Sequence, residues 1–478
     1  MISIAVIPID NRPVCYDLIY DTLSIDKNIN VLFPPIELLG DLKKIAKIDK
    51  ILDWLNSIKN IDVIIVSLDT IAYGGLISSR RSDDNFFIIK KRIDKFIDIV
   101  KKHNAKMYGF SSIMRISNNN VNEEEKDYWD KYGKIIFRYS NIVHKLSIQN
   151  SENLKSELKN LREKIPKNII ADYLKTRNRN FKINQYYLSL QKNNIFSTLI
   201  FSLDDCSEFG LNILEASKLN EEIKKYDNNN ICVKTGADEI PFTLVSKAYN
   251  DLINKNEKLK IFVKYANKNS INKISKYENK SVYASVSEAI KLSGCLIEYS
   301  SESESDIILF INNFTNEQGE LVMDIFEPSS NFIIQVEEIN KPFFVVDILN
   351  ANGADYKFVD DNKNIFSNDK FLGYSAWNTT SNSLGQAIAC AIIKYCSEDC
   401  ADISVFKKIQ AIRLLDDWIY QSHLRQKLRL DEKNLNNKIL YINMSEFHNT
   451  VEKMLNYKLD TVNYLYPWNR FFEIRVVI

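Results

Sequence analysis

The amino-acid sequence predicts an α/β protein built on a parallel sheet, TIM-barrel-like or doubly wound, with a helical insertion and a helical C-terminal layer. Three observations predict this fold class. Short runs rich in isoleucine and valine recur along the chain, a polar turn follows each of them, and longer segments with helical spacing of apolar residues separate them. This alternation is typical of parallel strands that are joined by crossover helices.

Ten apolar runs are the expected strands. Their short length and their β-branched and aromatic residues suit strands that are buried on both faces of a sheet. Ten strands are more than one barrel needs. In chain order, the expected strands are residues 3–7, 30–33, 63–68, 106–113, 198–203, 231–234, 261–264, 307–311, 343–347 and 371–375.

Several segments between and after these runs carry a helical pattern. Apolar residues recur at every third or fourth position in residues 42–58, 86–102 and 211–226, which predicts amphipathic helices. Residues 122–193 and 405–455 are mostly helical in pattern, with little strand character. We expect the first of these two segments to be an inserted helical hairpin or lid and the second to belong to a helical layer.

The expected organisation has two regions. Residues 1–400 form a barrel-like catalytic region that carries the insertion at 122–193. Residues 401–478 form a C-terminal helical layer that packs on it, and a last apolar strand at 472–477 closes this layer.

Composition disfavours several classes of partner. The 478 residues include 63 Lys and Arg against 62 Asp and Glu, so the net charge of +1 gives no long-range field that would attract nucleic acid or a membrane surface. No run of about 20 apolar residues occurs, and Pro8 and Asp10 interrupt the apolar N-terminal stretch, which favours a cytoplasmic protein without a signal sequence. Seven scattered cysteines favour reduced thiols.

Several familiar chemistries lack their motifs. The sequence contains no GxGxxG, GxxxxGK[ST], GxSxG, HExxH or CxxC pattern. Its four histidines all fall in expected helices or helix ends, where surface or packing roles are commoner than catalysis. Both observations disfavour a histidine-based mechanism.

Polar side chains follow nearly every expected strand. Ligands of α/β proteins bind at the carboxyl ends of the strands, so we expect these side chains to face one cavity. One tryptophan among carboxylates and amides suits a polyhydroxylated ligand, because an indole stacks on the apolar face of a sugar. For any single Asp or Asn, a helix N-cap is the alternative. The expected substrate-binding residues are Asp10, Arg12, Asp69, Tyr73, Arg115, Asp238, Glu239, Asp347, Asn352, Trp377 and Asn378.

The pair Asp204 and Asp205 is the expected catalytic element. Two neighbouring carboxylates repel, so that one tends to hold a proton while the other stays ionised, as an acid and its charged partner require. Successive side chains of a strand point to opposite faces, so joint action requires the chain to turn here. Equally, Asp204 could pack against Arg12 or Arg115 while Asp205 caps the next helix.

Ordered motifs along nearly the whole chain resemble a bacterial family filed as domain of unknown function 4127. The resemblance implies one integrated unit and brings no established activity. The motifs that carry it are PIDNRPV at 8–14, SLDTIAYGGLISSRR at 67–81, MRIS at 114–117, DD at 204–205, GADE at 236–239, WNT at 377–379, RLLDDW at 413–418 and PWNR at 467–470.

A second, local resemblance concerns chemistry. A strand that ends in Asp204 and Asp205, with Asn378 and Asn382 downstream, is similar to barrel glycosidases that act on N-acetylhexosaminides with two consecutive aspartates. This resemblance implies that Asp204 polarises the acetamido group of the substrate, which attacks the anomeric carbon, while Asp205 protonates the leaving oxygen.

We therefore expect a glycosidase-like hydrolase with a small carbohydrate substrate and no cofactor. One alternative is an isomerase or lyase in which Asp204, Asp205, Asp238 and Glu239 hold Mg²⁺ or Mn²⁺, because these cations prefer oxygen ligands. The other alternative is a carbohydrate-binding protein without catalytic activity. The sequence leaves the oligomeric state open.

Overall fold

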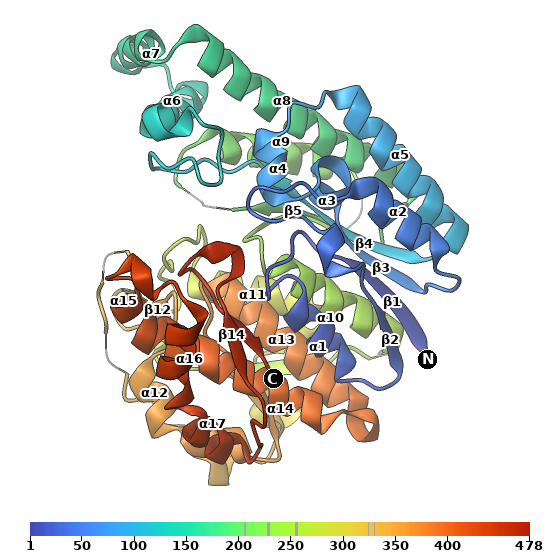
Figure 1. The fold of residues 1–478 in the computed structure, drawn as a ribbon, viewed down its shortest axis with the longest axis vertical. Helices are drawn as coiled ribbons and strands as arrows, with labels where there is room; N and C mark the ends of the chain where they lie inside the picture. Colours follow the sequence, from blue (N-terminus) through green and yellow to red (C-terminus); the bar gives the residue numbers. More distant parts are fainter. Residues whose placement is uncertain (205–206, 227–229, 254–256, 324, 329) are drawn as a thin grey trace. The chain divides into compact units, whose positions relative to one another are not determined.

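The computed structural model describes all 478 residues except 205–206, 227–229, 254–256, 324 and 329. The chain forms two compact units, each with its own parallel sheet (Figure 1). The expected boundary at residue 400 lies inside unit 1. Unit 1 comprises Met1, Arg12–Asn30 and Phe242–Ile478, and unit 2 comprises Ile2–Asn11 and Val31–Pro241.

The first sheet has six strands in the order β2-β1-β3-β4-β5-β6. From β1 to β6 in this order, neighbouring strands are parallel, and β1 registers Ile4 against Val63 of β3. All five residues of β3 are buried, as expected of a strand that begins with four apolar residues in a row. The strands are β1 (Ile2–Ile7), β2 (Ile29–Leu32), β3 (Val63–Ser67), β4 (Lys106–Ile113), β5 (Thr198–Leu203) and β6 (Ile231–Thr235).

The second sheet has five parallel strands in the order β13-β11-β9-β7-β8. In both sheets the first strand is flanked by the second on one side and by the third on the other, the order of a doubly wound fold. The strands are β7 (Lys260–Tyr265), β8 (Leu296–Glu298), β9 (Ile307–Asn313), β11 (Phe343–Ile348) and β13 (Phe371–Ser375).

Helices connect the strands of each sheet, and short two-stranded pairs complete unit 1. β10 (Gly319–Glu320) pairs with β12 (Asn350–Ala351), and β14 (Asn463–Leu465) pairs with β15 (Arg475–Val477). The helices of unit 2 are α2 (Ile48–Ser57), α3 (Leu68–Tyr73), α4 (Leu76–Arg81), α5 (Phe86–His103), α6 (Trp129–Ile148), α7 (Glu152–Lys164), α8 (Lys167–Leu190) and α9 (Leu211–Ile223).

Unit 1 carries most of the remaining helices and one π-helix, Leu414–Leu424. Helix α10 (Ile240–Ile253) begins in unit 2 and continues in unit 1. The other helices of unit 1 are α1 (Asp17–Ser24), α11 (Val282–Leu292), α12 (Tyr356–Asp361), α13 (Thr380–Ser397), α14 (Ile403–Arg413), α15 (Arg425–Leu428), α16 (Asn437–Ser445) and α17 (His448–Leu455).

The α/β fold class is confirmed, and each of the ten expected strands forms. Among the described residues the sheets end at β2 and β6 and at β13 and β8, so the arrangement is the doubly wound alternative and not the barrel. Two parallel sheets also account for a strand number too large for one barrel. The structure adds β8, a strand of three residues that the apolar pattern did not reveal.

One expected helix begins later than its pattern suggested. The segment 42–58 becomes helical only at Ile48, because the side chain of Asp41 accepts hydrogen bonds from the backbone N–H groups of Lys43 and Lys44, at 2.9 and 2.8 Å. Such side-chain bonds to the backbone compete with helix formation. The last strand is likewise shorter than expected and starts at Arg475.

The insertion at 122–193 is helical, as expected, and has an apolar core of its own. Trp129 and Ile136 of α6 pack with Tyr173 of α8, all at most 2% exposed, and the Trp129 and Tyr173 ring centroids lie 5.8 Å apart. Helix α8 also binds the sheet, because Ser111 of β4 donates a 2.7 Å hydrogen bond to Oδ1 of Asn184. The insertion is thus anchored on the sheet as well as packed within itself.

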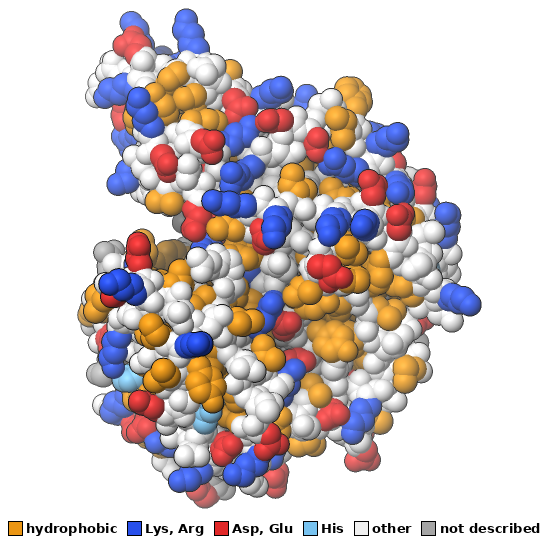
Figure 2. All heavy atoms as spheres, viewed as in Figure 1, with side chains coloured by type: hydrophobic (Ala, Val, Ile, Leu, Met, Phe, Trp, Pro, Cys, Tyr) orange, Lys and Arg blue, Asp and Glu red, His pale blue; other side chains and the backbone are white. Residues whose placement is uncertain are grey.

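Two features of the surface complete the description. Across the described part of the chain, every helix is too short or too polar to span a lipid bilayer. Figure 2 shows basic side chains lying among acidic ones on the visible face, in agreement with the net charge of +1.

Replacing Trp129 with alanine should lower the free energy of unfolding by about 3–5 kcal/mol, because the change removes a buried indole from the core of the insertion. Urea denaturation followed by circular dichroism measures the effect. Ile148→Ala, at a position that is 67% exposed, is the matched control and should change little. Equal transitions for the Trp129 variant and the parent would contradict the proposed core.

Candidate functional site

The carboxyl end of β3 places a buried carboxylate in unit 2. Ser67 caps α3 by accepting a hydrogen bond from Thr70, and Asp69 follows in the first turn. Oδ2 of Asp69 accepts a 2.8 Å hydrogen bond from the Ser112 N–H of β4, and Oδ1 has no hydrogen-bond partner. Burial raises the pKa of Asp69 to about 6, because the bonds from Ser112 and the positive charge of Arg80 only partly offset the lost hydration.

Two glycines turn the chain sharply from α3 into α4. Gly74 and Gly75 have φ values of 85° and 130°, which side chains rarely adopt, and a Cβ at Gly74 would lie 2.3 Å from the Ile45 side chain. Tyr73, just before this turn, is buried, with the Arg179 guanidinium 5.2 Å from its ring centroid. The turn brings Arg80, whose side chain is 1% exposed, into the unit.

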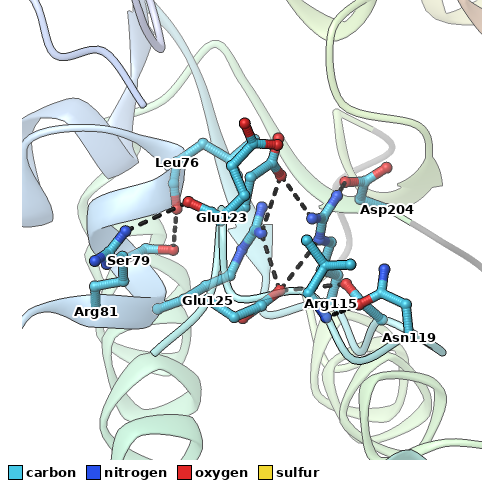
Figure 3. Close-up of polar contacts among 12 residues, drawn as sticks. Leu76, Ser79, Arg81, Arg115, Asn119, Glu123, Glu125 and Asp204 are labelled. Atoms are coloured by element: carbon cyan, nitrogen blue, oxygen red, sulfur yellow. Dashed lines mark hydrogen bonds and ion pairs between the residues drawn. The ribbon is translucent and has the colours of Figure 1, made fainter. Parts of the chain in front are cut away.

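Arg80 and Arg115 share two glutamates of the segment that follows β4 (Figure 3). Nη1 of Arg80 lies 3.2 Å from Glu125 and 3.5 Å from Glu124. Arg115 donates a 2.6 Å hydrogen bond to Oε2 of Glu124, and its Nε lies 3.5 Å from Oε1 of Glu125. Ser117 donates a further 3.2 Å hydrogen bond to Glu125. The buried guanidinium of Arg80 and the partly buried one of Arg115 are thereby paired, as burial of a charge requires.

Asp204 joins this network at the carboxyl end of β5. Nη1 of Arg115 lies 3.6 Å from Oδ2 of Asp204, and Figure 3 shows the two side chains pointing toward one another. The side chain of Asp204 is 27% exposed, whereas that of Glu125 is 4% exposed. A partly exposed carboxylate beside a guanidinium has a charged partner and can still meet a ligand. Asp205 lies outside the described residues.

Of the two carboxylates after β6, Glu239 has a partner within unit 2. Glu239 is fully buried and forms an ion pair with Lys234 of β6. Gly236, at φ 106°, makes room for it, because a Cβ there would lie 1.9 Å from Oε1 of Glu239. Asp238 and Asp10 are also buried, at 8% and 3% exposure. Within the described ranges no group of three or more His, Cys, Asp or Glu residues is arranged to hold a metal ion.

The remaining expected residues lie in unit 1. Asp347, at the end of β11, accepts hydrogen bonds from Asn312 at 3.0 Å and from the backbone N–H of Asp355 at 2.7 Å. Burial and the neighbouring Asp355 raise the pKa of Asp347 to about 7. Asn352 and Asn378 adopt φ values of 65° and 62°, and the Asn352 N–H donates to the Asn378 carbonyl at 2.7 Å.

Trp377 occupies a packed position. Its indole is 2% exposed, and its centroid lies 6.0 Å from that of Phe472, with the rings nearly perpendicular. The expected role as a sugar-stacking surface stays a prediction that requires this ring to be uncovered. Arg12 is 6% exposed and lies near Glu473, with Nε 4.0 Å from Oε1.

The expected residues thus divide between the two units. Unit 2 holds Asp10, Asp69, Tyr73, Arg115, Asp204, Asp238 and Glu239, and unit 1 holds Arg12, Asp347, Asn352, Trp377 and Asn378. The structure brings Arg115 and Asp204 together and adds three residues that the sequence analysis did not select, Arg80, Glu124 and Glu125. The sequence did offer a signal for this network, because two adjacent glutamates, Glu124 and Glu125, stand in the segment that follows the expected strand 106–113.

A second group involves the π-helix, a rare element that is frequent at functional sites; the sequence analysis quoted its RLLDDW motif but did not select its residues for the site. Asp417 accepts a 2.8 Å hydrogen bond from the Ala376 N–H just after β13, and Arg413 lies 3.2 Å from its other oxygen. Gln386 accepts from Arg413 at 2.6 Å. This group ties the π-helix to the carboxyl end of the second sheet.

The chain belongs to the family described as Protein of unknown function (DUF4127), whose model matches residues 4–477. The whole-chain resemblance expected from the ordered motifs is thereby confirmed. No curated protein matches the chain. The match shows that the chain is related to this family over almost its entire length, and the family description assigns no activity.

Asp69→Asn should remove a pH-dependent loss of stability. Burial in the folded state raises the pKa of Asp69 from 3.8 to about 6, so folding favours the protonated carboxyl. The free energy of unfolding of the parent therefore falls as the pH rises from about 4 to about 6. Relative to the variant, the parent should lose up to about 3 kcal/mol over this window. Urea unfolding at pH 4, 5, 6 and 7 measures the difference.

The control for this experiment is Asp98→Asn, at an exposed position of α5. The difference between this control and the parent should stay constant with pH. A constant difference for Asp69→Asn as well would show that Asp69 does not retain its proton on folding.

Proposed function

We propose that the protein is a glycosidase-like hydrolase in which Asp204 and Asp205 cleave a glycosidic bond, possible substrates including N-acetylhexosaminides. The observation that carries the proposal is the ion pair between Arg115 and a partly exposed Asp204 at the carboxyl end of β5. Carboxyl ends of parallel strands are where doubly wound proteins bind ligands. Asp204 has the exposure and the charged partner that a catalytic carboxylate requires.

In the proposed mechanism Asp204 remains ionised throughout. Its carboxylate orients and polarises the acetamido group of the substrate, whose oxygen attacks the anomeric carbon and forms a cyclic intermediate. Asp205 donates its proton to the leaving oxygen and then accepts a proton from the water that opens the intermediate. Arg115 keeps Asp204 charged and fixes its direction, while Glu124 and Glu125 hold the guanidinium in place through its Nη2 and Nε atoms.

The alternative with Mg²⁺ or Mn²⁺ has weaker support in the described residues. It requires Glu239 as a ligand, and this carboxylate is fully buried in an ion pair with Lys234. A metal ion would have to displace a buried ammonium group, which is costly unless another anion takes its place. A carbohydrate-binding protein without activity remains compatible with the same contacts of Arg115. Hydrolysis of a glycoside by the purified protein distinguishes the hydrolase from this alternative.

Asp204→Asn and Asp205→Asn should each lower kcat at least about a hundredfold on the nitrophenyl glycoside that the parent hydrolyses, because each removes a group that acts on the reacting sugar. Release of nitrophenol across a panel of glycosides, with N-acetylhexosaminides among them, measures the effect. Asp98→Asn provides a matched exposed carboxylate and should turn over normally. Activity of Asp205→Asn equal to that of the parent would remove Asp205 from the acid role.

Arg115→Gln should shift the acid limb of the pH–rate profile to higher pH, because Asp204 accepts a proton more readily without the guanidinium. Arg115→Lys should restore part of the shift, and Arg81→Gln, whose Nη1 donates to the Glu123 carbonyl, should leave the profile unmoved. Profiles of kcat/KM from pH 4 to 8 make the comparison. A loss of rate with no displacement of the limb would indicate a merely structural role.

A further inference from the structure

Two buried carboxyl groups meet at the carboxyl end of β11 in unit 1. Asp347 is 1% exposed and Asp355 is 5% exposed. They share the side-chain amide of Asn312, whose Nδ2 donates to Oδ1 of Asp347 at 3.0 Å and to Oδ2 of Asp355 at 3.5 Å. The backbone N–H of Asp355 also donates a 2.7 Å hydrogen bond to Oδ2 of Asp347. We call Asp347 and Asp355 the carboxyl pair.

The carboxyl pair has no positive charge in direct contact. In the part of the chain that the structure describes, no nitrogen of a basic side chain lies within 4.0 Å of either group. Lys357 donates its backbone N–H to Oδ1 of Asp355 at 3.1 Å, but its side chain is 53% exposed and pairs with Asp361 at 2.7 Å. Two buried carboxylates without a counter-charge repel, so the folded chain favours a proton on one of them. Burial accordingly raises the pKa of Asp347 and of Asp355.

Other ionisable groups around the carboxyl pair come from β13 and the π-helix. The Tyr374 hydroxyl of β13 donates to Oδ2 of Asp347 at 3.3 Å. Burial and then the charges of Asp347 and Asp417 raise the pKa of Tyr374, so this hydroxyl keeps its proton. Asp417, on the π-helix, lies 3.2 Å from Arg413. Burial raises the pKa of Asp417 to about 6, so it titrates in the same range, and substitutions in the carboxyl pair distinguish the two.

The carboxyl pair closes the base of a loop. Residues 348–354 leave the sheet directly after Asp347 and end at Asp355. Asp347 holds both ends of this loop, because it accepts hydrogen bonds from the backbone N–H of Leu349 at 3.2 Å and from that of Asp355. The loop carries Asn352, one of the expected substrate-binding residues, at φ 65°. Ionisation of both carboxyl groups would therefore loosen a loop at the ligand-binding edge of the second sheet.

We propose that the carboxyl pair is a pH-sensitive latch on the loop 348–354. While the pair holds a proton, its hydrogen bonds keep the loop closed. When both groups are ionised, their repulsion favours opening of the loop. Loops at strand ends commonly control the access of ligands. This inference does not depend on the proposed hydrolase, because it concerns a loop of unit 1 and requires no turnover.

Hydrogen–deuterium exchange of the full chain tests the latch. In the closed loop the pKa of Asp347 is raised from 3.8 to about 7, so the proton favours the closed form. Opening should therefore become easier as the pH rises from about 4 to about 7 and change little above that range. Mass spectrometry of peptides that cover residues 348–361, at pH 5, 6, 7 and 8, measures protection after division by the intrinsic exchange rates. Protection should fall at least about tenfold between pH 5 and pH 7.

Three variants separate the carboxyl pair from its surroundings. Asp347→Asn removes the carboxyl group that holds the loop and should flatten the fall in protection. Asp355→Asn keeps a side chain suited to capping α12 but removes the second charge, so the fall should level off at a lower pH. Asp360→Asn, at an exposed position of the same helix, is the matched control and should follow the parent.

Each outcome supports or overturns the latch. Protection that is independent of pH in the parent overturns it, and so does an identical profile for the parent and Asp355→Asn. A fall that persists unchanged in Asp347→Asn would assign the titration to Asp417 and would also overturn it. Circular dichroism confirms that each variant is folded, and if Asp347→Asn is not, Asp355→Asn decides. Because the assay needs no substrate, failure of the hydrolase proposal would leave this result unaffected.

Discussion

The pairing of buried arginines with carboxylates is the constraint on which the rest of unit 2 depends. A guanidinium cannot lose its proton, so Arg80, at 1% exposure, must keep a negative partner within the fold. Glu124 and Glu125 meet this need from the segment that enters the insertion, and Arg115 extends the pairing to Asp204. Breaking one such pair would leave an uncompensated buried charge, which costs far more than a surface ion pair contributes.

The strands were predictable from the sequence because a strand of a doubly wound sheet is buried on both faces. Its residues are mostly apolar or small, and 106–113, 198–203 and 371–375 match their observed strands without any shift. Helix starts were harder, since a side chain such as that of Asp41 can replace the first helical hydrogen bonds. The π-helix over Leu414–Leu424 has no sequence pattern that separates it from an ordinary helix.

The candidate site was predictable only in part. The rule that ligands bind at the carboxyl ends of parallel strands identified Asp204 and Arg115, because the topology alone puts both residues at one edge of the sheet. It could not reveal that Glu125 would pair with Arg115, since this residue belongs to a loop whose path the sheet does not fix. Nor could it tell that the indole of Trp377 packs against Phe472, because burial of an aromatic ring is decided by contacts far away in the sequence.

The division of residues between the two units has a consequence for the order in which the chain can fold during its synthesis. Strand β1 belongs to unit 2, whereas Arg12–Asn30, directly after it, belongs to unit 1 and binds partners made much later. Tyr249 donates a 2.7 Å hydrogen bond to Asp26, and the Lys27 N–H donates to the Cys400 carbonyl at 3.1 Å. During synthesis from the ribosome, the segment Arg12–Asn30 therefore gains these two partners only after residues as far along as Cys400 have emerged. Because each unit is made of separate stretches of the sequence, neither unit can be cut out as one continuous piece of chain.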